Sequence, residues 1–236
     1  MNPLSWLGIR RRGLSPAQQQ RLDALPAPQP LDDTPLDDCR FVVVDLETSG
    51  LNVNRDRILS VGAVVIENSL IDLGSQYECT LYQENHRVTE SVLIHGIAPS
   101  AVADGVAPAD ALLDFMDFAG TCIFVAFHAA FDHRMLQRGL RDELRHRLRH
   151  RFVDVAELAP MLCPAGGRRQ SLDEWQQHFK VVNQQRHHAA ADALATAELM
   201  LILLSLARRE KLETLADLDS RLRHWRRLRQ ARIGAM

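Results

Sequence analysis

A short apolar run that ends in two acids constrains the fold of this chain more than any other feature. Residues 41–44 are one phenylalanine and three valines, the composition of a buried strand, and Asp45 and Glu47 follow directly. Side chains alternate along a strand, so residues two apart point to the same side. The sequence therefore predicts two carboxylates side by side at the end of a buried strand, where both can reach one cation.

The residues that follow predict a mixed α/β sheet. Two further strands are expected over residues 59–66 and 76–82, joined by a connection short enough for antiparallel neighbours. Apolar segments at 121–127 and 152–153 predict two more strands, which alternate with helices. A meander followed by alternating helices and strands is typical of a mixed sheet covered by helices.

The two ends of the chain differ from its centre in composition. Residues 1–38 are rich in proline, glutamine and aspartate, with one short helix expected over 15–25, and we interpret them as an N-terminal extension or tether. Residues 39–206 form the main domain, which ends in a long helix over 189–206. Leucine spacing and many arginines predict a basic C-terminal helix within 207–236.

A second set of polar residues points to metal chemistry. Asp132 is expected near the start of a helix, and Asp192 in the first turn of another. Five residues on one helix would be about 140° apart, so His187 should lie in the loop before Asp192. Four acids and a histidine can hold two magnesium ions and deprotonate a water. Each acid alone would equally fit a solvated strand end or a helix start.

Composition fits a folded protein in a reducing compartment. The chain is 46% hydrophobic with a net charge of −2, while arginines cluster in 141–151 and 221–232, as on a phosphate-binding or a solvated face. The four cysteines form no C-x-x-C pair, which favours reduced thiols and the cytoplasm. The longest apolar stretch, residues 199–204, is too short to span a bilayer, so no membrane contact is expected.

Three segments together, DLETSGL, FHAAFD and HHAAAD, resemble the DnaQ-like exonuclease family in its histidine-bearing DEDD subclass, typified by the epsilon proofreading subunit of bacterial DNA polymerase III. The resemblance covers roughly residues 39–206. It implies a ribonuclease H-like fold with a mixed five-stranded sheet and two divalent ions, Mg²⁺ or Mn²⁺. It also implies release of nucleoside 5′-monophosphates from the 3′ end of single-stranded or frayed DNA, with a polymerase or repair partner.

The resemblance further implies residue roles. Its metal ligands would be Asp45, Glu47, Asp132 and Asp192, with His187 as the general base. The residues implied in nucleotide binding are Leu46, Thr48, Ser49, Leu51, His95, Ile97 and Phe131. Trimming of RNA 3′ ends and a non-catalytic nucleic-acid-binding subunit are the alternatives. The intact acid set argues against the second, and metal chemistry does not discriminate DNA from RNA.

Overall fold

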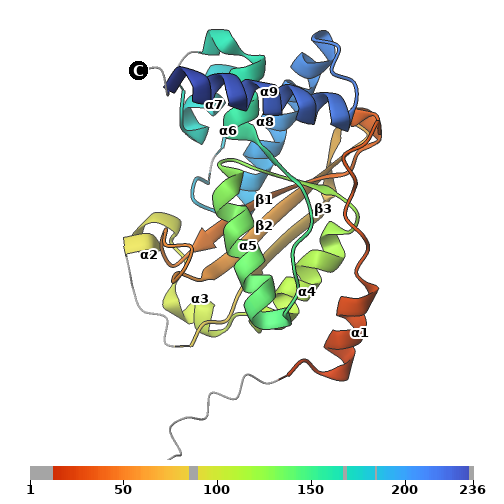
Figure 1. Cartoon of the computed structure of the whole chain (residues 1–236). Coiled ribbons are helices and arrows are strands. Elements are labelled where there is room, and N and C mark those ends of the chain that lie inside the picture. The colour runs from red at the N-terminus through yellow and green to blue at the C-terminus, as the bar shows by residue number, and fades with distance from the viewer. Residues whose placement is uncertain (1–12, 85–89, 167–168, 184, 234–236) are drawn as a thin grey trace, which may run out of the picture.

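A mixed five-stranded sheet forms the centre of the molecule (Figure 1). The computed structural model describes residues 13–84, 90–166, 169–183 and 185–233. The strands lie in the order β3-β2-β1-β4-β5, where β1 is antiparallel to β2 and parallel to β4. Their bounds are β1 Phe41–Thr48, β2 Ile58–Glu67, β3 Leu70–Thr80, β4 Ile123–Ala126 and β5 Phe152–Asp154. The predicted α/β fold with a mixed five-stranded sheet is confirmed.

Strand β3 begins earlier than the sequence predicts. A strand was expected from residue 76, whereas β3 starts at Leu70 after a tight turn at Asn68 and Ser69, both with positive φ. The central residues of a two-residue hairpin turn adopt such φ values. Because β3 lies at the sheet edge, Leu70 and Leu73 stay exposed and its first half lacks the apolar alternation of a half-buried strand.

Helices cover both faces of the sheet and enclose two hydrophobic cores. One core lies against α6, α7, α8 and α9, and the other against α4 and α5. The longer helices are α4 Pro108–Ala119, α5 Ala129–Leu144, α6 Val155–Leu162, α7 Leu172–Phe179, α8 Ala189–Arg209 and α9 Leu215–Ile233. Shorter helical segments are α1 Pro16–Ala24, α2 Glu90–His95, α3 Pro99–Ala103 and the 3₁₀ turns Leu36–Asp38 and Pro164–Gly166.

Helix α8 is the central helix of the first core. By length and composition alone it could cross a membrane, with a mean hydropathy of 1.8. In the protein 56% of that apolar segment is buried, and α8 packs across β1 and β2. It is therefore placed as a core helix, with its first turn at the polar end of β1.

The described part of the N-terminal segment packs against the rest of the protein. Helix α1 lies beside α4 (Figure 1), where Arg21 contacts Asp114 at 2.6 Å and Asp117 at 2.5 Å. Further along, the Leu36 N–H donates to the Glu213 carbonyl at 2.8 Å. Residues far apart in the sequence thus meet at both ends of this segment.

Candidate active site

Three carboxylates converge where β1 meets the start of α8. Asp45 and Glu47 extend from the same side of β1, and Asp192 lies in the first turn of α8. One oxygen from each lies within 4.8 Å of the others. Two sequence-predicted motifs that are more than 140 residues apart therefore form one cluster.

A glycine on the neighbouring strand allows this close approach. Gly62 pairs with Asp45 across β1 and β2, and α8 begins directly above it. A Cβ at Gly62 would lie 2.1 Å from the Ala190 nitrogen and 2.2 Å from the Ala189 carbonyl carbon. Both atoms belong to the backbone, so α8 can start here only because residue 62 has no side chain.

The cluster holds like charges together in a poorly solvated place. Burial raises the pKa of Asp45 well above its usual range, and the charges of Asp132, Glu47 and Asp192 raise it further. Burial and the charge of Asp192 likewise raise the pKa of Glu47 to about 7. Such a group of carboxylates is stabilised by a cation between its members.

Asp132 adds a fourth acid beside Asp45. It is buried near the start of α5, and burial raises its pKa, with a further rise from the charge of Asp154. A hydrogen bond from the backbone of Leu46 partly offsets that rise. Asp154 caps α6 and accepts from the His128 N–H at 3.0 Å. The sequence interpretation missed Asp154, which ends a strand of only three residues.

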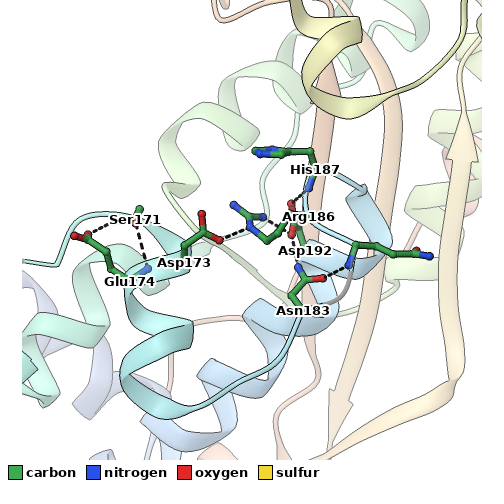
Figure 2. A network of polar contacts seen from close by, with 8 residues as sticks. Ser171, Asp173, Glu174, Asn183, Arg186, His187 and Asp192 are labelled. Carbon is green, nitrogen blue, oxygen red and sulfur yellow. Dashed lines mark hydrogen bonds and ion pairs between the residues drawn. The ribbon is translucent and has the colours of Figure 1, made fainter.

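A polar network around Asp192 was also missed (Figure 2). Arg186 forms ion pairs with both Asp192 and Asp173 of α7, and its charge lowers the pKa of Asp45 and Glu47. The Asn183 amide donates to Asp192 at 2.5 Å. The only sequence signal for Arg186 is its place directly before the H-x-A-x-x-D motif.

His187 lies in the loop before α8, the position that its spacing predicts. Its backbone has a φ of 62° and its N–H donates to Asp192 Oδ2 at 3.0 Å, so the loop is held to the first turn of the helix. The exposed side chain lines a pocket of about 330 Å³ together with Glu47. His188 lines the same pocket, where its Nε2 lies 3.1 Å from Glu78.

The residues implied in nucleotide binding separate into two groups. His95 and Ile97 line the pocket beside Glu47 and His187. The other five do not line this pocket: Leu46 and Thr48 are buried, Ser49 bonds to the Arg57 backbone, Leu51 is 86% exposed, and Phe131 packs on the α4–α5 core.

The donor set fits hard divalent cations. Every ligand atom in the cluster is a carboxylate oxygen, the type that Mg²⁺ and Mn²⁺ prefer. The raised pKa values of Asp45 and Glu47 show that the site has a deficit of positive charge despite Arg186. Asp45, Glu47 and Asp192 are the residues best placed to hold such an ion, with Asp132 next to Asp45.

Sequence comparison identifies relatives in DNA replication. Residues 42–200 match the family model described as Exonuclease (RNase_T). The DNA polymerase III PolC-type of Thermotoga maritima is 27% identical over 188 residues, which are 80% of this chain and 14% of that protein. The same polymerase of Oceanobacillus iheyensis is 32% identical over 161 residues, 68% of this chain and 11% of that protein. The chain thus spans a small part of these relatives.

Structural comparison finds the same fold in nucleases. Exonuclease X in complex with 5′ overhanging duplex DNA has a TM-score of 0.57 at 22% identity, covering 70% of this chain and 91% of that one. E. coli Exonuclease I in complex with a dT13 oligonucleotide has a TM-score of 0.61 at 16% identity, covering 73% and 42%. The ribonuclease H-like fold and the sequence match agree: the chain belongs to the exonuclease family, whose members use divalent metal ions.

Proposed function

We propose that this protein is a 3′–5′ exonuclease that hydrolyses phosphodiester bonds at the 3′ end of single-stranded or frayed DNA and releases nucleoside 5′-monophosphates. The observation that carries the proposal is the cluster of Asp45, Glu47 and Asp192 within 4.8 Å, which opens beside a pocket lined by Glu47 and His187. The family match supports nuclease chemistry at this place.

In this proposal four carboxylates, Asp45, Glu47, Asp132 and Asp192, hold two divalent ions, Mg²⁺ or Mn²⁺. Bound there, the ions would stabilise the charge on the attacking and leaving oxygens of an in-line displacement. The cluster supports this role because its own repulsion is relieved by cations. Asp192 is kept in place by three donors, which are Asn183, Arg186 and the His187 N–H.

His187 would act as the general base that accepts a proton from the attacking water. Its near-neutral intrinsic pKa suits that role. Its ring lies on the pocket wall shared with Glu47, and its backbone is bonded to Asp192, so loop and helix move as one unit.

The pocket itself would receive the terminal nucleotide. Its volume of about 330 Å³ lies at the lower end of the range for small-ligand sites. We propose that His95 and Ile97 contact the nucleotide from α2 and the loop after it. Leu51, exposed at the start of the β1–β2 loop, would contact a base, whereas Leu46, Thr48, Ser49 and Phe131 would shape the site from beneath.

The alternatives from the sequence remain outcomes of the test. An exoribonuclease would use the same acids, and a non-catalytic binding subunit would keep the fold without turnover. PolC-type relatives are polymerases, which supports a polymerase or repair partner for this chain. The four cysteines are all free thiols, in keeping with our proposal that the protein works in the cytoplasm.

The test is a parallel digestion of 3′-labelled and 5′-labelled DNA and RNA oligonucleotides with Mg²⁺, Mn²⁺ or chelator. We expect metal-dependent, stepwise release of 5′-monophosphates from DNA 3′ ends. Circular single strands should resist digestion. Rapid nicking of circles, release from the 5′ end, or activity in excess chelator would each contradict the proposal, and a clear preference for RNA would reassign the substrate.

A further inference from the structure

A second hollow lies on the other side of the β1–β2 loop from the nucleotide pocket. It measures about 700 Å³ and lies between that loop and α5. Arg55 and Arg57 line it from the loop, and Arg138 lines it from the helix. Two walls with the same charge sign make a groove suited to an anionic chain rather than to a compact neutral ligand.

The helix wall continues as a stripe of arginines. The stripe, Arg134, Arg138, Arg141 and Arg145, recurs at helical spacing along one face of α5 and at its end. Three of the four are exposed and Arg138 is partly buried. From first to last the stripe is about 16 Å long at 1.5 Å per residue. One strand of B-DNA presents about five phosphates over that axial distance.

Little of this positive charge is neutralised within the protein. Arg57, Arg134 and Arg138 form no ion pair with any residue that the structure describes. Asp142 and Glu143 also line the groove, but Asp142 is already paired with Arg141 at 3.1 Å. Arg55 meets Asp56 only at 3.8 Å and is 82% exposed. The arginines facing the groove therefore outnumber the free acids.

Both walls lead directly to the acid cluster. The Ser49 N–H donates to the Arg57 carbonyl at 2.9 Å, and the Arg57 N–H donates to the Ser49 hydroxyl at 3.0 Å, two residues beyond Glu47. On the other wall Asp132 precedes Arg138 by six residues of α5, about 9 Å along the axis. Figure 1 shows α5 running along the sheet beside α4, so the stripe extends away from the cluster.

We propose that this groove binds the sugar-phosphate backbone of the substrate strand upstream of its 3′ end, with Arg57 and Arg138 as the main phosphate contacts. The inference rests on the proposed function and adds to it: the enzyme prefers chains of several nucleotides over dinucleotide-sized esters. The contacts are to phosphate, so they carry no base specificity.

The test compares Arg57→Gln/Arg138→Gln with a matched control, Arg223→Gln/Arg227→Gln, which removes the same charge from the exposed face of α9. The probe is a fluorescent twelve-nucleotide oligo(dT), and anisotropy in chelator measures binding without hydrolysis. We expect the groove variant to bind about tenfold more weakly. Its log Kd against log salt slope should fall by about 1.4, or about 0.7 for each lost phosphate contact on a single strand.

A second substrate separates the groove from the catalytic site. The p-nitrophenyl ester of thymidine 5′-monophosphate has one phosphodiester and cannot reach the groove, so the groove variant should hydrolyse it within twofold of the wild-type rate. Unchanged oligonucleotide binding and salt slope, an equal loss in the control, or an equal loss on the small ester would overturn the groove assignment. A wild type that binds the oligonucleotide through these arginines but hydrolyses neither substrate would overturn only the proposed function.

Discussion

Two groups of acids in this protein lie in opposite surroundings. Asp45, Glu47 and Asp192 face one another in a partly buried cluster, and the pKa values of Asp45 and Glu47 are raised. On the exposed side of α4, Asp114 and Asp117 both accept hydrogen bonds from Arg21 of α1. The α4 acids are ordinary surface partners, whereas the cluster opposes folding unless a cation binds. The difference indicates that the cluster is kept for chemistry and not for stability.

The largest expected effect is that of Asp45→Asn. The variant should lose turnover by roughly a thousandfold or more, since a bound ion contributes several kcal/mol to transition-state stabilisation. Single-turnover digestion of a 5′-labelled oligonucleotide measures the loss. A near-wild-type rate would show that Asp45 is not a metal ligand.

The same variant should not unfold more easily in chelator. Folding raises the pKa of Asp45 and Glu47, so their ionised forms destabilise the folded protein and stability falls as pH rises through the folded pKa. For Glu47 that window runs from about 4.5 to about 7. Melting temperatures should therefore decrease across this window in wild type and less so in Asp45→Asn. A flat wild-type profile would contradict the description of the cluster.

His187→Ala should reduce the rate by about 10²–10⁴-fold while leaving the four carboxylates in place. The wild-type rate should rise with pH through the histidine titration, and that limb should flatten in the variant. His224→Ala is the matched control, because His224 is exposed on α9. His188 is unsuitable as a control, since it lines the pocket and contacts Glu78. Loss of activity in the control with full activity in His187→Ala would refute the base assignment.

Gly62→Ala tests how the fold brings the acids together. Its new methyl group meets the backbone of Ala189 and Ala190, so the start of α8 must shift and carry Asp192 away from Asp45. We expect a stability loss of about 1–3 kcal/mol and a rate loss of about 10²-fold. Gly74→Ala is the control, because its nearest neighbour is the Asp72 side chain at 3.2 Å. Equal behaviour of the two variants would exclude this role for Gly62.

The smallest effect is expected on the other side of the comparison. Asp117→Asn removes one exposed partner of Arg21, whose second partner Asp114 remains. Stability should change by less than about 0.5 kcal/mol and activity not at all. Denaturant unfolding measures it, and a large change would mean that the docking of α1 depends on this pair.

Local patterns predicted most of the fold, because they are written in neighbouring residues. The valines of β1, the capping box at Ser171 and the five-residue spacing from His187 to Asp192 each act within one or two turns of chain. The partners of Arg21 and Arg186 were not predictable. An arginine reaches many acids, and only the folded chain selects Asp114 and Asp117 for one and Asp173 and Asp192 for the other.

The edge strand failed for a related reason. Leu70 and Leu73 are exposed, so the first half of β3 shows no apolar alternation, and its pairing with β2 depends on the turn at Asn68 and Ser69. Likewise Gly62 carries no sequence signal of its own, since its importance comes from a helix that begins 127 residues later.

Calorimetric titration of Mn²⁺ into the wild type, Asp45→Asn and Asp117→Asn tests the central claim most directly, because it measures cation binding without any substrate. The account predicts saturable binding by the wild type and Asp117→Asn, and binding that is lost or greatly weakened in Asp45→Asn. Equal binding by all three proteins, or none by the wild type, would show that the acids at the end of β1 are not a metal site.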